Sequence, residues 1–165
     1  VAKLDRAIVK DELVIKTWQA DLPEWGLPLL PGEQFTAQLK VDAPVNLSHG
    51  WQIEIAIIEP APENFLEAML EKGPHEAWVD FDLLGLPLTV RGREPGERWQ
   101  PLGMAGHTQT VQDFFINKKI PAHLRDRWPL VIHKKEIVWV TGKRPSEVFK
   151  LTSHTRRILQ LKLVR

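Results

Sequence analysis

The stretch WQIEIAII, residues 51–58, decides the class of fold. Trp51, Ile53, Ile55 and Ile57 occupy every second position in it. Side chains alternate between the two faces of a strand, so these four would share one face. An amphipathic helix would instead need apolar residues three and four positions apart. The stretch therefore predicts a β-strand that is buried on one face.

Similar alternation continues on both sides of this strand, bounded by glycine and proline. It predicts further strands over residues 13–18, 35–41, 75–82, 87–91, 129–133, 136–140 and 157–164. Lys134 and Lys135 make a two-residue connection, which predicts a hairpin between the strands on either side of it. In the last strand, Leu159, Leu161 and Leu163 would lie on one side.

Shorter segments have helical features. Residues 62–73 are expected to form a helix that ends at Gly73. Its apolar face would consist of Phe65, Leu66, Met69 and Leu70.

Thr110 can cap a second helix, over residues 111–118. Prolines bound a third helical segment, over residues 122–127. We expect an α+β fold, rich in β structure, in which packed sheets form a sandwich-like arrangement with short helices.

The composition excludes several classes of protein. The 165 residues include no cysteine, so disulfides and thiol nucleophiles are ruled out. No apolar run approaches the roughly 20 residues that a membrane span needs. We therefore expect a cytoplasmic protein with no membrane partner.

Charge divides the chain near Gly85. Residues 1–85 carry 6 Lys and Arg against 15 Asp and Glu, a net charge of −9, whereas residues 86–165 carry 16 against 6, a net charge of +10. One interpretation is that the basic part faces a polyanion. The other is an uneven spread over solvated surfaces. We expect residues 1–85 to form an acidic β-rich scaffold that packs with the basic region, 86–165, as one compact unit.

Motifs of catalysis are missing from this sequence. It has no phosphate-binding G-x-x-x-x-G-K-[ST] loop, no G-x-G-x-x-G and no G-x-S-x-G. Its six histidines are isolated, which argues against a metal site. Asp80 and Asp82 would share one side of a strand and are interpreted as a polar strand edge.

Arginines and glycines are concentrated in VRGREPGERWQPLGMAGHTQTVQDFF, residues 90–115. Glycines allow bends that turn successive N–H groups toward an anion, and arginine forks match phosphate geometry. More basic residues follow on the predicted helices. Together these give the candidate nucleic-acid-binding residues, which are Arg91, Arg93, Arg98, Lys118, Lys119, Arg125 and Arg127.

Pairing within the protein is the alternative for some of these residues. Arg98 could instead form an ion pair with Asp113 or Glu97.

Several motifs in fixed order resemble the C-terminal domain of bacterial tRNA(Ile)-lysidine synthetase. They are VRGREPGERWQPLGMAG, DFFINKKIPAHLRDRWPLV and EIVWVTGKR, so the resemblance is strong over about residues 87–142 and loose over residues 1–85. It implies a fold similar to a domain of the phenylalanyl-tRNA synthetase β subunit. It also implies a role in gripping the acceptor stem of tRNA(Ile).

The resemblance implies that the parent enzyme is a ligase. It uses ATP to adenylate the wobble cytidine of tRNA(Ile) and then attaches lysine there. That chemistry belongs to an N-terminal catalytic domain with an S-G-G-x-D-S loop, which this sequence lacks. ATP, with magnesium, would bind that domain. We therefore expect no cofactor and no catalysis in this chain, with tRNA(Ile) and the catalytic domain as partners and a homodimer as an open alternative.

By motif, Arg91, Arg93 and Arg98 stand at the family's three arginines, with Lys119 and Arg125 at two further basic positions. The sequence departs from the family at HTQT, residues 107–110, where many members carry a Lys-Lys pair. This departure could shift the RNA contact toward Arg98 and the two lysines at 118 and 119. The remaining alternative is a packing or oligomerisation domain without RNA contact.

Overall fold

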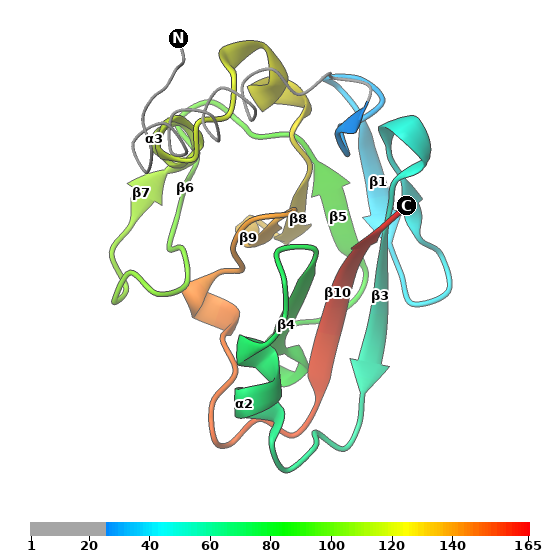
Figure 1. Ribbon diagram of the computed structural model, residues 1–165, viewed down its shortest axis with the longest axis vertical. Coiled ribbons are helices and arrows are strands. Elements are labelled where there is room, and N and C mark those ends of the chain that lie inside the picture. The colour runs from blue at the N-terminus through cyan, green and yellow to red at the C-terminus, as the bar shows by residue number, and fades with distance from the viewer. Residues whose placement is uncertain (1–25) are drawn as a thin grey trace, which may run out of the picture.

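Two four-stranded antiparallel sheets pack against each other in the computed structural model, which describes residues 26–165 (Figure 1). One sheet has the strand order β1-β5-β8-β9 and the other β2-β3-β10-β4. A separate two-stranded ribbon joins β6 and β7. The predicted sandwich-like α+β fold is confirmed. The strand expected over residues 13–18 lies outside the described residues.

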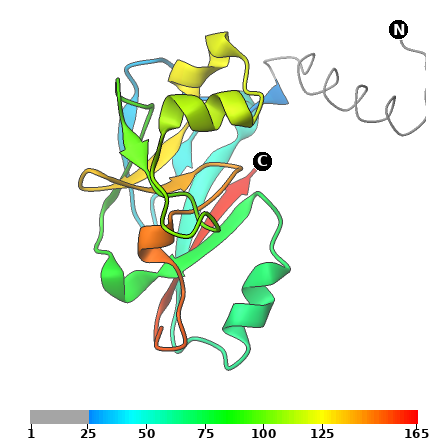
Figure 2. The same ribbon diagram turned by 90° about the vertical axis from the view of Figure 1, so that its left-hand side faces the viewer.

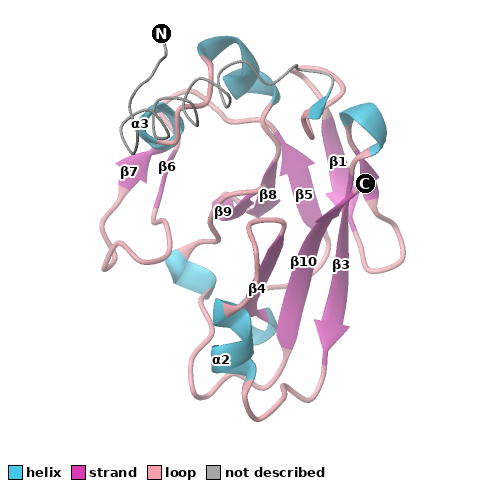
Figure 3. Cartoon of the chain, in the orientation of Figure 1, coloured by secondary structure: helices cyan, strands magenta, loops and turns pink. Residues whose placement is uncertain are grey.

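The first sheet comprises β1 (Thr36–Leu39), β5 (Leu88–Arg91), β8 (Leu130–His133) and β9 (Glu136–Val140). The second comprises β2 (Val45–Asn46), β3 (Gln52–Ile58), β10 (Ile158–Val164) and β4 (Glu76–Asp80), and the ribbon comprises β6 (Arg98–Trp99) and β7 (Gln109–Thr110). The α-helices are α2 (Phe65–Leu70) and α3 (Val111–Asn117). Short 3-10 helices are η2 (Ser48–Gly50), η3 (Phe81–Leu83), η4 (Ala122–Arg127) and η5 (Glu147–Phe149). Figure 3 colours these elements by type.

Strand β10 lies at the centre of the second sheet, between β3 and β4. Leu159, Leu161 and Leu163 alternate toward the interior, as predicted, and are buried. They pack with residues of the opposite sheet, among them Val90 of β5 and Val131 of β8. Burying aliphatic side chains from both inner faces is what holds a sandwich together.

Strands β8 and β9 are buried on both faces. Their outer side packs under α3 and η4, through residues such as Ile132 and Ile137. The register shifts so that Val131 pairs with Trp139 and Ile132 with Ile137. Val138 is therefore the extra residue of a bulge, and both it and Trp139 join the core between the sheets.

Helix α3 begins at Val111, as predicted, and ends at Asn117, one residue before the expected end. The Thr110 side chain accepts a hydrogen bond from the Asp113 backbone N–H at 3.0 Å, which satisfies one of the free N–H groups of the first turn. Phe114 and Phe115 are buried beneath the helix. Figure 2 shows α3 and η4 at one end of the molecule and α2 at the other.

Some expectations about the helices are wrong. Helix α2 covers only Phe65–Leu70 and ends before Gly73. Only part of its expected apolar face is covered, because Leu66 is 39% and Leu70 79% exposed. The helical segment predicted over residues 122–127 is present with those bounds, as the 3-10 helix η4.

The two aspartates expected on one strand edge also separate. Asp80 is buried at the end of β4 and accepts a hydrogen bond from the Thr155 hydroxyl, whereas Asp82 lies in η3 and pairs with Arg157. The strand ends at Asp80 because its other carboxylate oxygen accepts the Asp82 N–H and caps η3. Both carboxylates therefore have structural partners.

Candidate nucleic-acid interface

The arginine motif, residues 91–98, comprises the last residue of β5, a loop over residues 92–97 and the first residue of β6. Arg91 donates two hydrogen bonds to the Glu97 carboxylate, at 2.6 and 3.2 Å, and a third to the Gly92 carbonyl. The side chains of Arg91 and Glu97 are 17% and 10% exposed. A two-point arginine–carboxylate pair of this kind fixes both groups in direction. The pair closes the loop, and the Glu94 backbone N–H also donates to Glu97.

Arg93 is held by side chains from two other segments. Its guanidinium donates to Asp126 at 2.9 Å and to the side-chain oxygen of Gln112, and it lies 5.9 Å from the Phe115 ring centroid. The lack of a side chain at Gly92 allows this approach, because a Cβ there would lie 2.7 Å from the Asp126 carbonyl oxygen. Arg93 therefore ties the motif loop to η4 and α3.

The two arginines of η4 contact backbone. Arg125 donates to the Ile120 carbonyl at 2.9 Å. Arg127 donates to the Leu30 carbonyl at 3.0 Å and to the Ser48 hydroxyl at 3.3 Å. Both side chains are half-buried. Of the seven candidate residues, these two together with Arg91 and Arg93 are thus bound within the protein.

The other three candidates make fewer contacts with the described part of the protein. Arg98 and Lys119 are exposed and Lys118 is half-buried, and none makes an ion pair with a carboxylate of residues 26–165. Arg98 makes one long contact, at 3.5 Å, to the Thr108 carbonyl. The alternative in which Arg98 pairs with Asp113 or Glu97 is wrong, because Glu97 is occupied by Arg91 and no ion pair joins Arg98 to Asp113 in this part of the chain.

Further basic residues join these three, and they were not among the candidates that the sequence indicated. Arg98 lines a surface hollow with Lys134 and Lys135 of the β8–β9 turn, and Glu94 and Glu97 line the same hollow. Lys143 and Arg144 come shortly after β9, and the Lys143 ammonium lies over a ring of the same aromatic cluster as the Lys118 ammonium. The basic pair in TGKR, residues 141–144, was the available signal in the sequence.

Burial and neighbouring charge act on Lys118 and Lys143. Partial burial, and then the Arg144 charge, lower the pKa of Lys118 below its ordinary 10.5. Burial, and then the Lys118 charge, lower the pKa of Lys143 in the same direction. Each ammonium lies over an aromatic ring, Lys118 at 5.6 Å from Phe114 and Lys143 at 5.4 Å from Trp128. The aromatic rings under α3 thus support the two charges.

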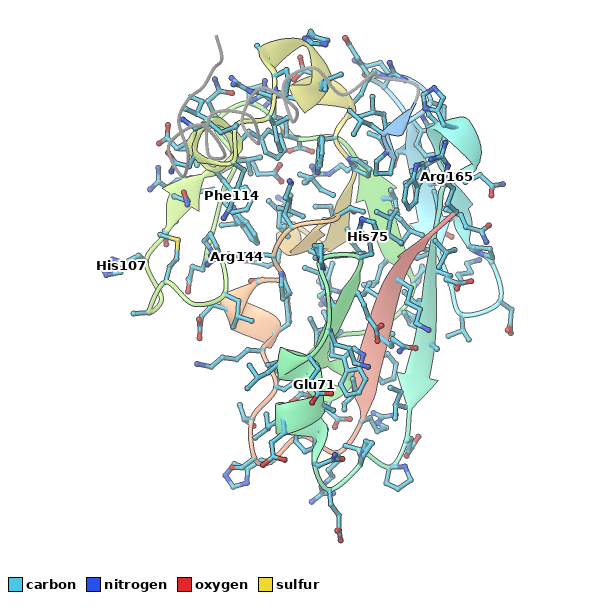
Figure 4. The ribbon with its side chains drawn as sticks, in the orientation of Figure 1. Glu71, His75, His107, Phe114, Arg144 and Arg165 are labelled. Atoms are coloured by element: carbon cyan, nitrogen blue, oxygen red, sulfur yellow. The ribbon has the colours of Figure 1, made fainter. Side chains whose placement is uncertain are left out.

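A glycine-rich loop, residues 102–108, lies beside this group. Arg144 anchors its start by donating to the Leu102 carbonyl at 3.0 Å, and the Gly103 N–H donates to Glu147 at 3.3 Å. Gly103 has a φ of 88° and Gly106 a φ of 80°, which residues with side chains rarely adopt. Figure 4 shows Arg144 on the same side of the molecule as Phe114 and His107, away from Arg165.

The described residues offer no donor set for a metal. Within residues 26–165, no group of three or more His, Cys, Asp or Glu residues could hold an ion. None of the helices in residues 26–165 has the length and apolar character that crossing a membrane requires.

Comparison with known proteins gives a consistent result. The family model "TilS substrate C-terminal domain" matches residues 88–161. A solved structure described as "Crystal structure of TILS C-terminal domain" has a TM-score of 0.65 and 31% identity, covering 78% of this chain and 95% of that one. This chain belongs to the TilS C-terminal domain family. Because the match covers 95% of the solved domain, the family assignment applies to the fold as a whole.

Two curated relatives extend the comparison. A tRNA(Ile)-lysidine synthase of Caldanaerobacter subterraneus subsp. tengcongensis is 46% identical over 88 residues, covering 53% of this chain and 19% of the relative. One of Dehalococcoides mccartyi is 38% identical over 112 residues, covering 68% and 23%. The chain thus spans about a fifth of the length of these relatives.

A likeness of fold reaches beyond the TilS family. An N-terminal fragment of the phenylalanyl-tRNA synthetase β-subunit from Pyrococcus horikoshii has a TM-score of 0.54 and 20% identity, covering 67% of this chain and 38% of that one. The fold similarity that the sequence motifs implied is confirmed.

Proposed function

We propose that this chain is the tRNA-gripping C-terminal part of a tRNA(Ile)-lysidine synthetase. The parent enzyme would use ATP, with magnesium, in a separate catalytic domain to attach lysine to the wobble cytidine of tRNA(Ile) in the cytoplasm. This chain would hold the acceptor stem and carry out no chemical step. The family membership supports the parent activity.

One observation carries the RNA-binding part of the proposal. Arg98 lies in the β6–β7 ribbon and Lys118 and Lys119 follow α3, and no carboxylate of residues 26–165 forms an ion pair with any of them. Arginine and lysine in such positions bind phosphates without reading bases. RNA stems suit that mode, because their bases are hidden in a deep, narrow major groove.

A packing role is the second candidate. Arg91, Arg93, Arg125 and Arg127 all make contacts within the protein, so part of the arginine motif serves the fold. On this view the basic surface would meet the catalytic domain or a second copy of the chain rather than RNA.

Binding to two labelled RNA hairpins of equal stem length tests the proposal. One would reproduce the acceptor stem of tRNA(Ile) and the other its anticodon arm. We expect the acceptor hairpin to bind at least threefold more tightly. Equal affinity would overturn the acceptor-stem assignment, and binding to neither hairpin would overturn the RNA-binding function in favour of packing.

A further inference from the structure

Helix α2 leaves two leucines exposed at the end of the molecule opposite α3 (Figure 2). Its inner face packs in one cluster with Trp78 of β4, through Phe65 and Met69. Leu66 and Leu70 lie outside this cluster and face solvent. Single exposed leucines are ordinary on protein surfaces, so the surroundings of these two decide whether they form part of a docking surface.

A hollow beside α2 extends its apolar surface. The hollow has a volume of 260 Å³, and its apolar lining includes Met69, Leu70, Trp78, Leu102 and Pro145. It thus reaches from α2 across β4, which is an edge strand of its sheet, to the segment that follows β9. Sites for small molecules usually have volumes of roughly 300–1,000 Å³, so this smaller hollow suits one or two side chains of a protein partner.

Two of the charged residues that line this hollow already have a partner. Lys72 forms an ion pair with Glu76 at 3.6 Å and lies 4.7 Å from the centroid of the Trp78 ring. The third, Lys143, lies over the Trp128 ring. The hollow itself therefore offers mainly apolar contacts.

Glutamates lie next to the exposed leucines. Glu67 belongs to α2 and Glu71 directly follows it, and both are exposed. Neither forms an ion pair with another residue of the described range 26–165. Figure 4 shows Glu71 at the α2 end of the molecule, away from Phe114. We call Leu66, Leu70, Glu67 and Glu71, together with the hollow, the α2 surface.

The charge of the α2 surface restricts what can cover it. A nucleic acid would be repelled by the two glutamates. A second copy related by a two-fold axis would bring the same glutamates against each other, because such an interface uses the same patch on both copies. A segment with apolar side chains next to Lys or Arg would complement both the leucines and the glutamates.

The size of the α2 surface favours a partner in the same polypeptide. Stable interfaces between separate proteins bury roughly 1,200–2,000 Å² in total, whereas this surface consists of one helix of 6 residues and one hollow. A tethered partner needs less contact, because the covalent link gives it a high effective concentration. The chain spans 19% and 23% of two lysidine synthases that it matches, so most of such an enzyme lies outside it.

We propose that the α2 surface docks onto the remaining part of the parent synthetase, against a segment that carries apolar side chains next to Lys or Arg. The inference rests on the proposed function only in placing this chain within a longer synthetase, and it requires no contact with RNA. Docking through α2 leaves the opposite end of the domain, which carries α3, away from the interface (Figure 2).

Carbodiimide cross-linking of the complete parent enzyme, read by peptide mass spectrometry, tests this inference. The reagent joins a carboxylate to an amine without a spacer, so it reports only groups in contact. We expect Glu67 or Glu71 to be joined to a lysine outside the 165 residues of this chain. Mixing copies with light and heavy nitrogen isotopes distinguishes links within one chain from links between two.

The variant Leu66→Ser/Leu70→Ser keeps both reactive carboxylates and removes the apolar contact. Its yield of these cross-links should fall by about fivefold or more. The matched control Val41→Ser/Leu83→Ser changes two exposed apolar residues elsewhere and should alter the yield by less than about 1.5-fold. Urea unfolding of the 165-residue chain with each pair of changes checks folding, and Leu70→Ser alone replaces the double variant if its midpoint is lowered.

Several results would overturn the inference. Cross-links confined to lysines of this chain, such as Lys3, Lys10 or Lys16, would show that the chain itself covers the α2 surface. Cross-links between isotope-labelled copies would make it a contact between two molecules. An unchanged yield in the leucine variant would show that the apolar contact is absent. A parent protein that gives the expected cross-links but binds no tRNA(Ile) would contradict the proposed function alone and support the docking.

Discussion

Arg91 and Arg98 stand seven positions apart in one motif, and their surroundings differ in almost every respect. Arg91 is enclosed by Glu97, Glu94 and the Gly92 carbonyl. Arg98 is exposed and donates only to the Thr108 carbonyl among residues 26–165. Within one motif, Arg91 thus fixes the loop by its pair with Glu97, whereas the charge of Arg98 faces solvent.

The Arg91–Glu97 pair leads to a prediction about stability. Replacing Arg91 by Ala should lower the free energy of unfolding by about 2 kcal/mol, because Glu97 would be left largely buried without its partner. The matched variant Arg98→Ala should change it by less than about 0.5 kcal/mol. Urea unfolding of both variants measures the difference. Equal losses of unfolding free energy in the two variants would contradict the stabilising role of the Arg91–Glu97 pair.

Glu76 leads to a prediction about pH. Burial raises its pKa, but hydrogen bonds from Gln160 and Trp78 and the charges of Lys72 and Lys162 outweigh this and lower it below 4.5. A carboxyl with a lowered folded-state pKa stabilises the fold above pH 4.5, and this contribution is lost as pH falls through the folded-state value.

Glu76→Gln should therefore be less stable than the parent at pH 7, and the difference should shrink as pH falls below 4.5. Urea midpoints between about pH 7 and about pH 3 provide the measurement. Glu63→Gln, at an exposed position, serves as the control. A difference that stays constant across this range would show that the hydrogen bonds of Glu76 do not depend on its charge.

At the scale of elements, α3 positions Lys118 and Lys119, which directly follow it. Replacing Thr110 by Ala removes the hydrogen bond to the Asp113 N–H and should cost about 1 kcal/mol, whereas Thr110→Ser should keep most of it. Thermal unfolding of the two variants compares them directly. If both lose the same stability, the cap does not hold the helix.

The strands and α3 could be predicted from sequence because each depends on local alternation or on a local cap. The ends and the buried face of helix α2 could not be predicted, because the apolar residues Leu66 and Leu70 are exposed in the structure. The position of Lys143 over the Trp128 ring could not be predicted, because the two residues are 15 positions apart and only the folded chain brings them together. The bonding of Arg93 to Asp126 is likewise a long-range contact.

At the scale of the whole molecule, strands from the acidic and the basic part share each sheet. Strand β1 pairs with β5, and β10 lies between β3 and β4. The acidic and the basic part of the chain therefore contribute strands to the same sandwich. The division of the chain at residue 85 into a scaffold region and a basic region remains a prediction.

The whole chain should also be inactive as an enzyme. With ATP, lysine and transcribed tRNA(Ile), we expect it to form no AMP, because the sequence has no phosphate-binding loop. A radiolabelled-ATP assay provides the check, with a complete lysidine synthetase as the positive control. AMP formation above background would contradict the assignment of all chemistry to another domain.

Salt-dependent titration of labelled tRNA(Ile) transcript with the 165-residue chain tests the central claim most directly. With about three to five phosphate contacts, binding should be roughly micromolar or weaker at physiological salt, and the log–log slope should lie between about −2 and −4.5. Lys118→Ala/Lys119→Ala should bind more weakly with a flatter slope and still be folded. Binding that is absent, or that does not change with salt, would contradict the claim that this chain grips tRNA.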